Sequence, residues 1–236
     1  MLRIIDARSG EPVPAAPARR APTRVMAHVP DGDPTGLRVL LVADLLVRAL
    51  ELGGTPVWAV LPPGARPRPD ATRLGVRPFE DGADGAPDGT RTLHVAAEGA
   101  APPDGPVVAV APVRAADPDP SAAADPDALR AALLRRHHHT PLELGADALD
   151  TARGALLDRR RAVADWARHP SRPVPDTVRE RLRAAWNDDL DAPGVLAVLT
   201  ETAADPGLPE GARFEIHAHA DRFLGLGLTA AVGTPP

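Results

Sequence analysis

Three residue types with distinctive chemistry are missing from the chain: cysteine, tyrosine and lysine. The absence of cysteine excludes disulfides, thiolate zinc ligands and cysteine nucleophiles. All 27 basic residues are arginine, so every reaction that needs a side-chain amine is excluded as well. The preference for arginine, together with 29 prolines, is typical of a protein from a GC-rich genome.

Long apolar runs and an excess of positive charge are also missing. No apolar segment approaches the roughly 20 residues that cross a bilayer, and the opening residues 1–12 lack the apolar core of a signal peptide. The formal net charge of −5 argues against a general nucleic-acid coat. These features predict a soluble, cytoplasmic protein that does not associate with membranes.

The first half of the chain predicts a small α/β domain over residues 1–124. Apolar runs typical of strands are at 2–5, 24–29, 55–61, 93–96 and 106–110. Residues 37–52 are apolar on most helical faces and stop at Gly53-Gly54, whereas 11–23 are rich in proline and predict a loop. Strand, helix and strand within about 40 residues indicate a βαβ unit. We expect a compact, Rossmann-like parallel sheet of about four strands.

The second half, residues 125–236, predicts an antiparallel helix bundle. Helical patterns cover 127–137, 147–166, a segment that begins at Pro175-Asp176, 191–199 and 213–226. Asp191 is the expected N-cap of the fourth helix, with Pro193 in its first turn. Arginines 159–161 are assigned to the solvated face of the second helix. The fold class is therefore α/β plus all-α.

Five segments resemble, in the same order, the cysteinyl-tRNA synthetase family and its close relative, mycothiol cysteine ligase. They are MLRIIDARSGEPVP (1–14), the helix 37–53, RRHHHTPLEL (135–144), AWNDDLDAP (185–193) and FLGLGL (223–228). The resemblance covers roughly 1–61 and 125–228. It implies a class I synthetase sheet that binds ATP, followed by that family's helical region.

The groups that this family uses to activate an amino acid are missing. Arg38 matches the family's arginine after the HIGH signature, which places Asp33 to Gly36 where the two histidines belong. An aspartate there would repel a phosphate, and the KMSKS loop cannot exist without lysine. We therefore interpret Asp33, Gly36 and Arg38 as degenerate nucleotide-site positions and expect no cofactor.

The family's zinc site is degenerate too. His28 lies near the position of the first zinc-binding cysteine, but the other ligands fall in the shortened middle of the domain. His137, His138 and His139 are expected at the end of a helix, where successive side chains diverge by about 100° and rarely bind one ion. Asp188, Asp189 and Asp191 predict a helix cap and interhelix turn, with a metal site as the alternative. We expect no metal.

These observations favour a truncated, catalytically inactive relative of the family that acts in binding or regulation, with a protein partner. An alternative is an enzyme that takes a pre-activated donor, such as an aminoacyl-tRNA or acyl adenylate, in a pocket formed by His28, Asp33 and His94. Binding of tRNA is a third possibility, through arginines 153, 159, 160, 161, 168 and 172. Interleaved aspartates, such as Asp158 beside Arg161, favour an ordinary solvated helix instead.

Overall fold

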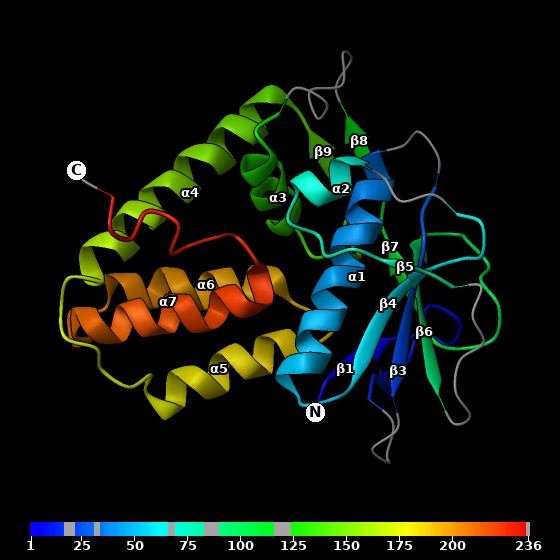
Figure 1. Ribbon diagram of the computed structural model, residues 1–236, viewed down its shortest axis with the longest axis horizontal. Helices are drawn as coiled ribbons and strands as arrows, with labels where there is room; N and C mark the ends of the chain where they lie inside the picture. The colour runs from blue at the N-terminus through cyan, green and yellow to red at the C-terminus, as the bar shows by residue number, and fades with distance from the viewer. Residues whose placement is uncertain (17–21, 31–33, 66–68, 83–89, 116–123, 235–236) are drawn as a thin grey trace.

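The computed structural model describes residues 1–16, 22–30, 34–65, 69–82, 90–115 and 124–234. A five-stranded parallel sheet lies on one side of the molecule and helices on the other, with α1 (Pro34–Leu52) between them (Figure 1). The predicted combination of a Rossmann-like α/β part with a helical part is confirmed. No helix in the described ranges is both long enough and apolar enough to span a membrane.

The central sheet has the strand order β5-β4-β3-β6-β7. Its strands are β3 (Thr23–His28), β4 (Val57–Leu61), β5 (Glu80–Asp81), β6 (Arg91–Ala97) and β7 (Val107–Val110). The strands predicted at 93–96 and 106–110 are both present and pair in parallel with each other. The sheet has one strand more than expected, because the two-residue β5 adds to the edge of β4. Strands buried on both faces show as continuous apolar runs, which is why the sequence revealed them.

Helix α1 is buried on nearly all sides. It packs against β3, β4 and β6 on one side and against α7 (Glu210–Leu224) on the other. Fifteen of its 19 residues are buried, which explains why its sequence is apolar around the whole circumference. It ends where Gly54 takes a left-handed conformation at φ 76°, as the Gly53-Gly54 pair predicted.

Two small sheets were not predicted. β1 (Arg3–Ile5) pairs antiparallel with β2 (Pro12–Pro14), so the expectation that 11–23 is entirely loop was wrong. β8 (Val113–Ala115) pairs in parallel with β9 (Leu142–Leu144). Each pair is only three residues long and is stabilised by tertiary packing, which leaves no periodic signal in the sequence.

The remaining helices are α2 (Pro69–Arg73), α3 (Pro126–Leu134), α4 (Ala146–Trp166), α5 (Asp176–Asn187) and α6 (Ala192–Ala204). The Asp191 carboxylate accepts a hydrogen bond of 2.8 Å from the Gly194 amide and caps α6 as predicted. α3 ends three residues before the predicted His137, so the three consecutive histidines follow the helix in a turn. The premise that they occupy a helix end was therefore wrong.

A buried imidazole on α7 makes stability depend on pH. His217 is 0% exposed, and its Nδ1 lies 2.8 Å from the Arg213 carbonyl oxygen. Its Nε2 has no hydrogen-bond partner among the described residues, and its ring centroid is 4.9 Å from that of Trp166. Burial lowers the pKa of His217 to about 4. The folded protein therefore holds a neutral ring over a pH range in which the unfolded chain is protonated.

We expect the free energy of unfolding to fall by about 3 kcal/mol as the pH drops from about 6.5 to about 4 because of this group alone. The sign follows from proton counting: in this range the unfolded state binds more protons, so acid favours unfolding. Urea unfolding of the wild type and His217→Gln at pH 7 and pH 4.5 measures the effect. The wild type should lose more stability than the variant between the two pH values, and equal losses would contradict the prediction.

Candidate functional site

Neighbouring strands of the central sheet bring together two of the three residues predicted to form a pocket. His28 is the last residue of β3 and His94 lies in the neighbouring strand β6. The Nε2 atom of His28 is 2.9 Å from Nδ1 of His94, whose Nε2 is 3.3 Å from the Asp104 carbonyl oxygen. Burial lowers the pKa of both imidazoles, so the pair is neutral near pH 7. Asp33 lies outside the described residues.

The first turn of α1, where the resemblance places a nucleotide site, is covered by protein. Gly36 is buried, and Thr35, only 2% exposed, accepts a hydrogen bond of 3.1 Å from the Val113 amide of β8. The Arg38 side chain points into the protein and is 1% exposed. Its guanidinium donates hydrogen bonds to four backbone carbonyls, those of Ala111, Arg136, His137 and Thr140. Arg38 therefore fixes backbone segments instead of facing a ligand.

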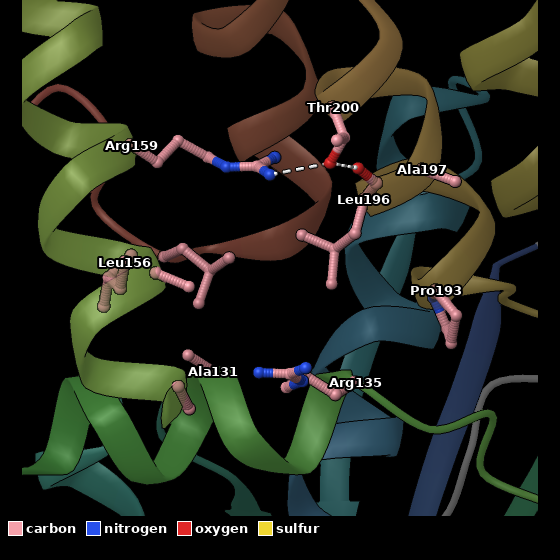
Figure 2. A pocket seen from close by; sticks show the side chains of 11 residues that line it. Ala131, Arg135, Leu156, Arg159, Pro193, Leu196, Ala197 and Thr200 are labelled. Carbon is pink, nitrogen blue, oxygen red and sulfur yellow. Dashed lines mark hydrogen bonds between the residues drawn. The ribbon is translucent and has the colours of Figure 1, made fainter. Parts of the chain in front are cut away.

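A cavity of about 400 Å³ lies among α3, α4 and α6. This volume falls within the range of small-molecule sites. Its walls are mostly apolar side chains, with Leu156 and Leu196 facing each other across the space (Figure 2). Arg159 reaches in from α4 on one side, and Arg135 projects from the end of α3 on another (Figure 2).

The two arginines of this cavity have no carboxylate partner in the described part of the chain. The Nη2 atom of Arg159 donates to Thr200 Oγ1 at 2.9 Å, whereas its Nη1 is buried and has no hydrogen-bond partner in the ranges that the structure describes. Burial lowers the pKa of Arg159, yet an arginine stays protonated at neutral pH. An apolar space with two unpaired cations suits an organic anion, whose charge would pair with guanidinium groups and whose body would fill the cavity.

Sequence reasoning missed this cavity because it placed arginines 159–161 together on a solvated face. Only Arg161 is there: its side chain is 72% exposed and pairs with Asp158 at 2.9 Å, as predicted. Arg160 is 15% exposed and pairs with Asp127 of α3 at 2.8 Å. Successive helical side chains point about 100° apart, so the first and third of three consecutive arginines differ in direction by about 200° and do not share one narrow face. That geometric constraint was the available signal.

The chain was also compared with known proteins. No family model matches it. It is similar to proteins named L-cysteine:1D-myo-inositol 2-amino-2-deoxy-alpha-D-glucopyranoside ligase. The Streptosporangium roseum protein is 40% identical over 109 residues, covering 44% of this chain and 26% of the relative. The Acidothermus cellulolyticus protein is 38% identical over 108 residues, which cover 46% of this chain and 26% of the relative. The Parafrankia protein is 46% identical over 82 residues, which cover 34% of this chain and 17% of the relative.

The matched part of the chain corresponds to about a quarter of the length of the first relatives. Four of these relatives are 36–40% identical to this chain over nearly half of its length. These identities confirm that the chain resembles the cysteine ligases related to cysteinyl-tRNA synthetase.

Proposed function

We propose that this chain is a cysteine-ligase-like protein that does not activate amino acids and instead binds a small organic anion in the cavity among α3, α4 and α6. The single observation that carries the loss of activation is the first turn of α1. There the residues that would face ATP phosphates are replaced or turned into the protein.

The electrostatics of that turn support the first half of the proposal. Adenylate formation needs positive groups against a triphosphate. The positions equivalent to the HIGH signature read Asp33-Pro34-Thr35-Gly36, and the sequence holds no lysine. The nearby cation, Arg38, is engaged by four carbonyls and is 1% exposed. Arg38 is therefore not free to neutralise a triphosphate at this turn.

The cavity supports the second half. Its apolar walls favour an aromatic or aliphatic body, and its two arginines favour one carboxylate, sulfonate or phosphate group. Nη1 of Arg159 is buried and has no partner among the residues that the structure covers. An anion that accepts a hydrogen bond there would therefore satisfy a group that is otherwise costly to bury. We therefore assign the binding function to this cavity.

The proposal is tested in two arms. In the first, ATP–pyrophosphate exchange is measured with each of the twenty amino acids, and titration calorimetry measures ATP binding. We expect no exchange above the protein-free background and no tight binding of ATP. Clear exchange with any one amino acid would contradict the claim that amino-acid activation is lost.

In the second arm, the probe is 8-anilinonaphthalene-1-sulfonate, which carries one anionic group on an aromatic body. We expect Arg159→Gln to weaken binding of the probe roughly 10-fold or more, because a charge-assisted hydrogen bond contributes about 1.5–3 kcal/mol. Arg161→Gln, two residues away on the same helix, is the matched control, since its side chain is 72% exposed. Equal binding by the wild type and both variants would rule out the cavity as the site.

A second candidate function rests on the direct contact between His28 and His94. A neutral pair of imidazoles in direct contact on neighbouring strands is suited to proton transfer, which an enzyme that uses a pre-activated donor would need. The cavity described above lies elsewhere, among the helices. We therefore prefer the binding function, and a donor enzyme remains the alternative if the second arm fails.

A further inference from the structure

The turn that follows α3 directs three imidazoles toward one point. Arg38 holds the carbonyl oxygens of Arg136, His137 and Thr140 at 3.2, 2.8 and 2.7 Å, and the Ala111 amide donates to the His138 carbonyl at 2.8 Å. With the backbone fixed in this way, the side chains of three successive histidines lie together. The ring centroids of His137 and His138 are 4.3 Å apart, as are those of His138 and His139.

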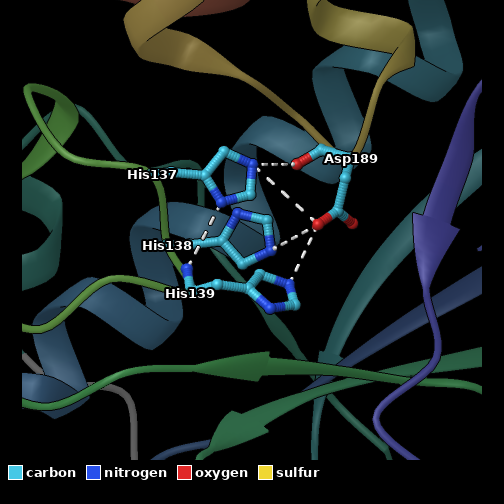
Figure 3. Close-up of side chains that lie close together, drawn as sticks. All are labelled: His137, His138, His139 and Asp189. Carbon is cyan, nitrogen blue, oxygen red and sulfur yellow. Dashed lines mark hydrogen bonds and ion pairs between the residues drawn. The ribbon is translucent and has the colours of Figure 1, made fainter. Parts of the chain in front are cut away.

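A carboxylate from a distant part of the chain faces these rings. Asp189 lies in the turn between α5 and α6, about fifty residues after the histidines. Its Oδ2 is 2.9 Å from Nε2 of His139, 3.5 Å from Nε2 of His138 and 3.9 Å from Nε2 of His137 (Figure 3). One ligand atom from each of the four residues lies within 4.8 Å of all the others.

The Asp189 carboxylate is held by a second set of contacts. Its Oδ1 accepts a hydrogen bond of 2.8 Å from the Ile5 amide, and its own amide donates to the Arg3 carbonyl at 3.0 Å. The backbone of Asp189 has a φ of 50° and that of Leu190 a φ of 60°, values that residues other than glycine rarely adopt. β1 and an unusual turn thus direct Oδ2 toward the imidazoles. Metal-binding carboxylates are commonly oriented by such outer contacts.

Two buried atoms in the centre of this group lack hydrogen-bond partners. His138 and Asp189 are each only 5% exposed. Nε2 of His138 and Oδ2 of Asp189 face each other, and neither makes a hydrogen bond within the described part of the chain. Buried polar atoms are nearly always paired, and an unpaired one needs an explanation. A bound cation would satisfy both atoms at once.

We propose that His137, His138, His139 and Asp189 form a structural Zn²⁺ site. Neutral imidazoles and a carboxylate are ligands that zinc prefers, and four protein ligands give the closed tetrahedral arrangement of structural sites. Tetrahedral zinc separates its ligand atoms by about 3.3 Å. The ring nitrogens would therefore rotate inward slightly, and His137 Nε2 would exchange its hydrogen bond of 3.1 Å to the Asp189 carbonyl for the ion.

The site would join three parts of the fold. The histidines belong to the turn after α3, the carboxylate belongs to the turn before α6, and that carboxylate is anchored to β1. The position differs from the degenerate zinc site discussed for His28, which lies at the end of the central sheet. It was not expected from the sequence, because a turn, unlike a helix, can bring three adjacent side chains to one side.

The test is titration of the full-length, chelator-treated protein with Zn²⁺ alone, followed by calorimetry and by thermal unfolding. We expect one ion per chain and a rise in melting temperature that increases with free Zn²⁺, because an ion that binds only the folded state stabilises it. Co²⁺ should give the visible absorption of a tetrahedral complex. The absence of stoichiometric binding would overturn the proposal.

Two variants distinguish a four-ligand zinc site from metal binding by the three consecutive histidines alone. Asp189→Asn retains an oxygen for the Ile5 amide, so the turn should fold, but its neutral amide is a poor zinc ligand. His139→Gln removes an imidazole that is 31% exposed, which leaves the core intact. Loss of an outer-shell group costs about 10–100-fold in affinity, so loss of either ligand should cost roughly 100-fold or more.

His169→Gln is the matched control, because this histidine is 52% exposed and pairs with Glu210 on another face. It should bind Zn²⁺ as the wild type does. If Asp189→Asn binds Zn²⁺ as tightly as the wild type, then the histidine run alone captures the metal and the proposed site is wrong.

Discussion

Replacing Asp44 by asparagine is expected to lower the free energy of unfolding by about 3–5 kcal/mol. The Asp44 side chain is 1% exposed in the middle of α1. Its Oδ2 is 3.0 Å from Nη2 of Arg130 and 2.7 Å from Nε of Arg48. Burial raises the pKa of Asp44, but the charges and hydrogen bonds of Arg130 and Arg48 outweigh it and leave this pKa below its ordinary value.

The size of the effect comes from the arginine that would remain. Arg130 of α3 is 1% exposed, and it also donates to the carbonyls of Leu74 and Leu224 at 3.0 and 2.7 Å. Among the described residues, Asp44 is the carboxylate that forms an ion pair with Arg130, so its removal leaves a buried charge with only the weaker influence of Asp221 to oppose it. Arg130 joins α1, α3 and the end of α7, so the loss should destabilise the whole molecule.

Urea and thermal unfolding measure this change. A loss of 3–5 kcal/mol corresponds to a fall in melting temperature of roughly 10 °C for a chain of this size. The matched control is Glu51→Gln on the same helix, which breaks the pair between Glu51 and Arg77, 47% and 38% exposed. Exposed pairs contribute about 0–1 kcal/mol, so the control should unfold nearly as the wild type does. An equally small effect of Asp44→Asn would refute the interpretation.

Arg38→Met is the second substitution with a large expected effect, a loss of at least about 3 kcal/mol. The guanidinium satisfies four carbonyl oxygens, at distances between 2.7 and 3.2 Å. Methionine fills a similar volume but leaves all four without this donor. The His137 carbonyl keeps the Thr140 amide at 2.8 Å, and each buried polar group that is left unsatisfied costs about 1–3 kcal/mol. Part of the loss is offset, because burying the arginine is itself unfavourable, as the lowering of its pKa to about 10 indicates.

Two further variants make the Arg38 result specific. Arg38→Lys keeps the charge but lacks the planar fork that reaches several carbonyls, so its stability should fall between those of Arg38→Met and the wild type. Arg114→Met removes a side chain that is 68% exposed and should change stability by less than about 1 kcal/mol. If Arg38→Lys is as stable as the wild type, the fork geometry is unimportant and charge alone explains the burial.

The parts of the fold that the sequence predicted have local causes. The strands around Val25, Leu93 and Val108 are buried on both faces, so they read as apolar runs. The α6 cap depends on Asp191 and Gly194, which are three residues apart. Such features depend on neighbours in the chain, and a reading of the sequence can therefore find them.

The parts that were missed have causes far away in the chain. α3 stops at Leu134 although its pattern continues, and the carbonyls of Arg136 and His137 beyond its end bind the distant Arg38 side chain. The convergence of Asp189 on the histidines depends on β1, and nothing near Asp189 in the sequence signals it. β2 begins and ends with proline, a residue that lacks an amide donor, and it pairs through a contact that no strand propensity indicates.

The burial of α1 on all sides has a consequence for synthesis on the ribosome. Its sheet-facing side can be covered once β3, β4 and β6 have emerged, but its other side waits for α7. α7 begins at Glu210, roughly 160 residues after the helix is complete. At about 5–20 residues per second, translation leaves this apolar surface uncovered for roughly 8–30 s. The nascent chain therefore exposes an apolar face of α1 for most of its synthesis.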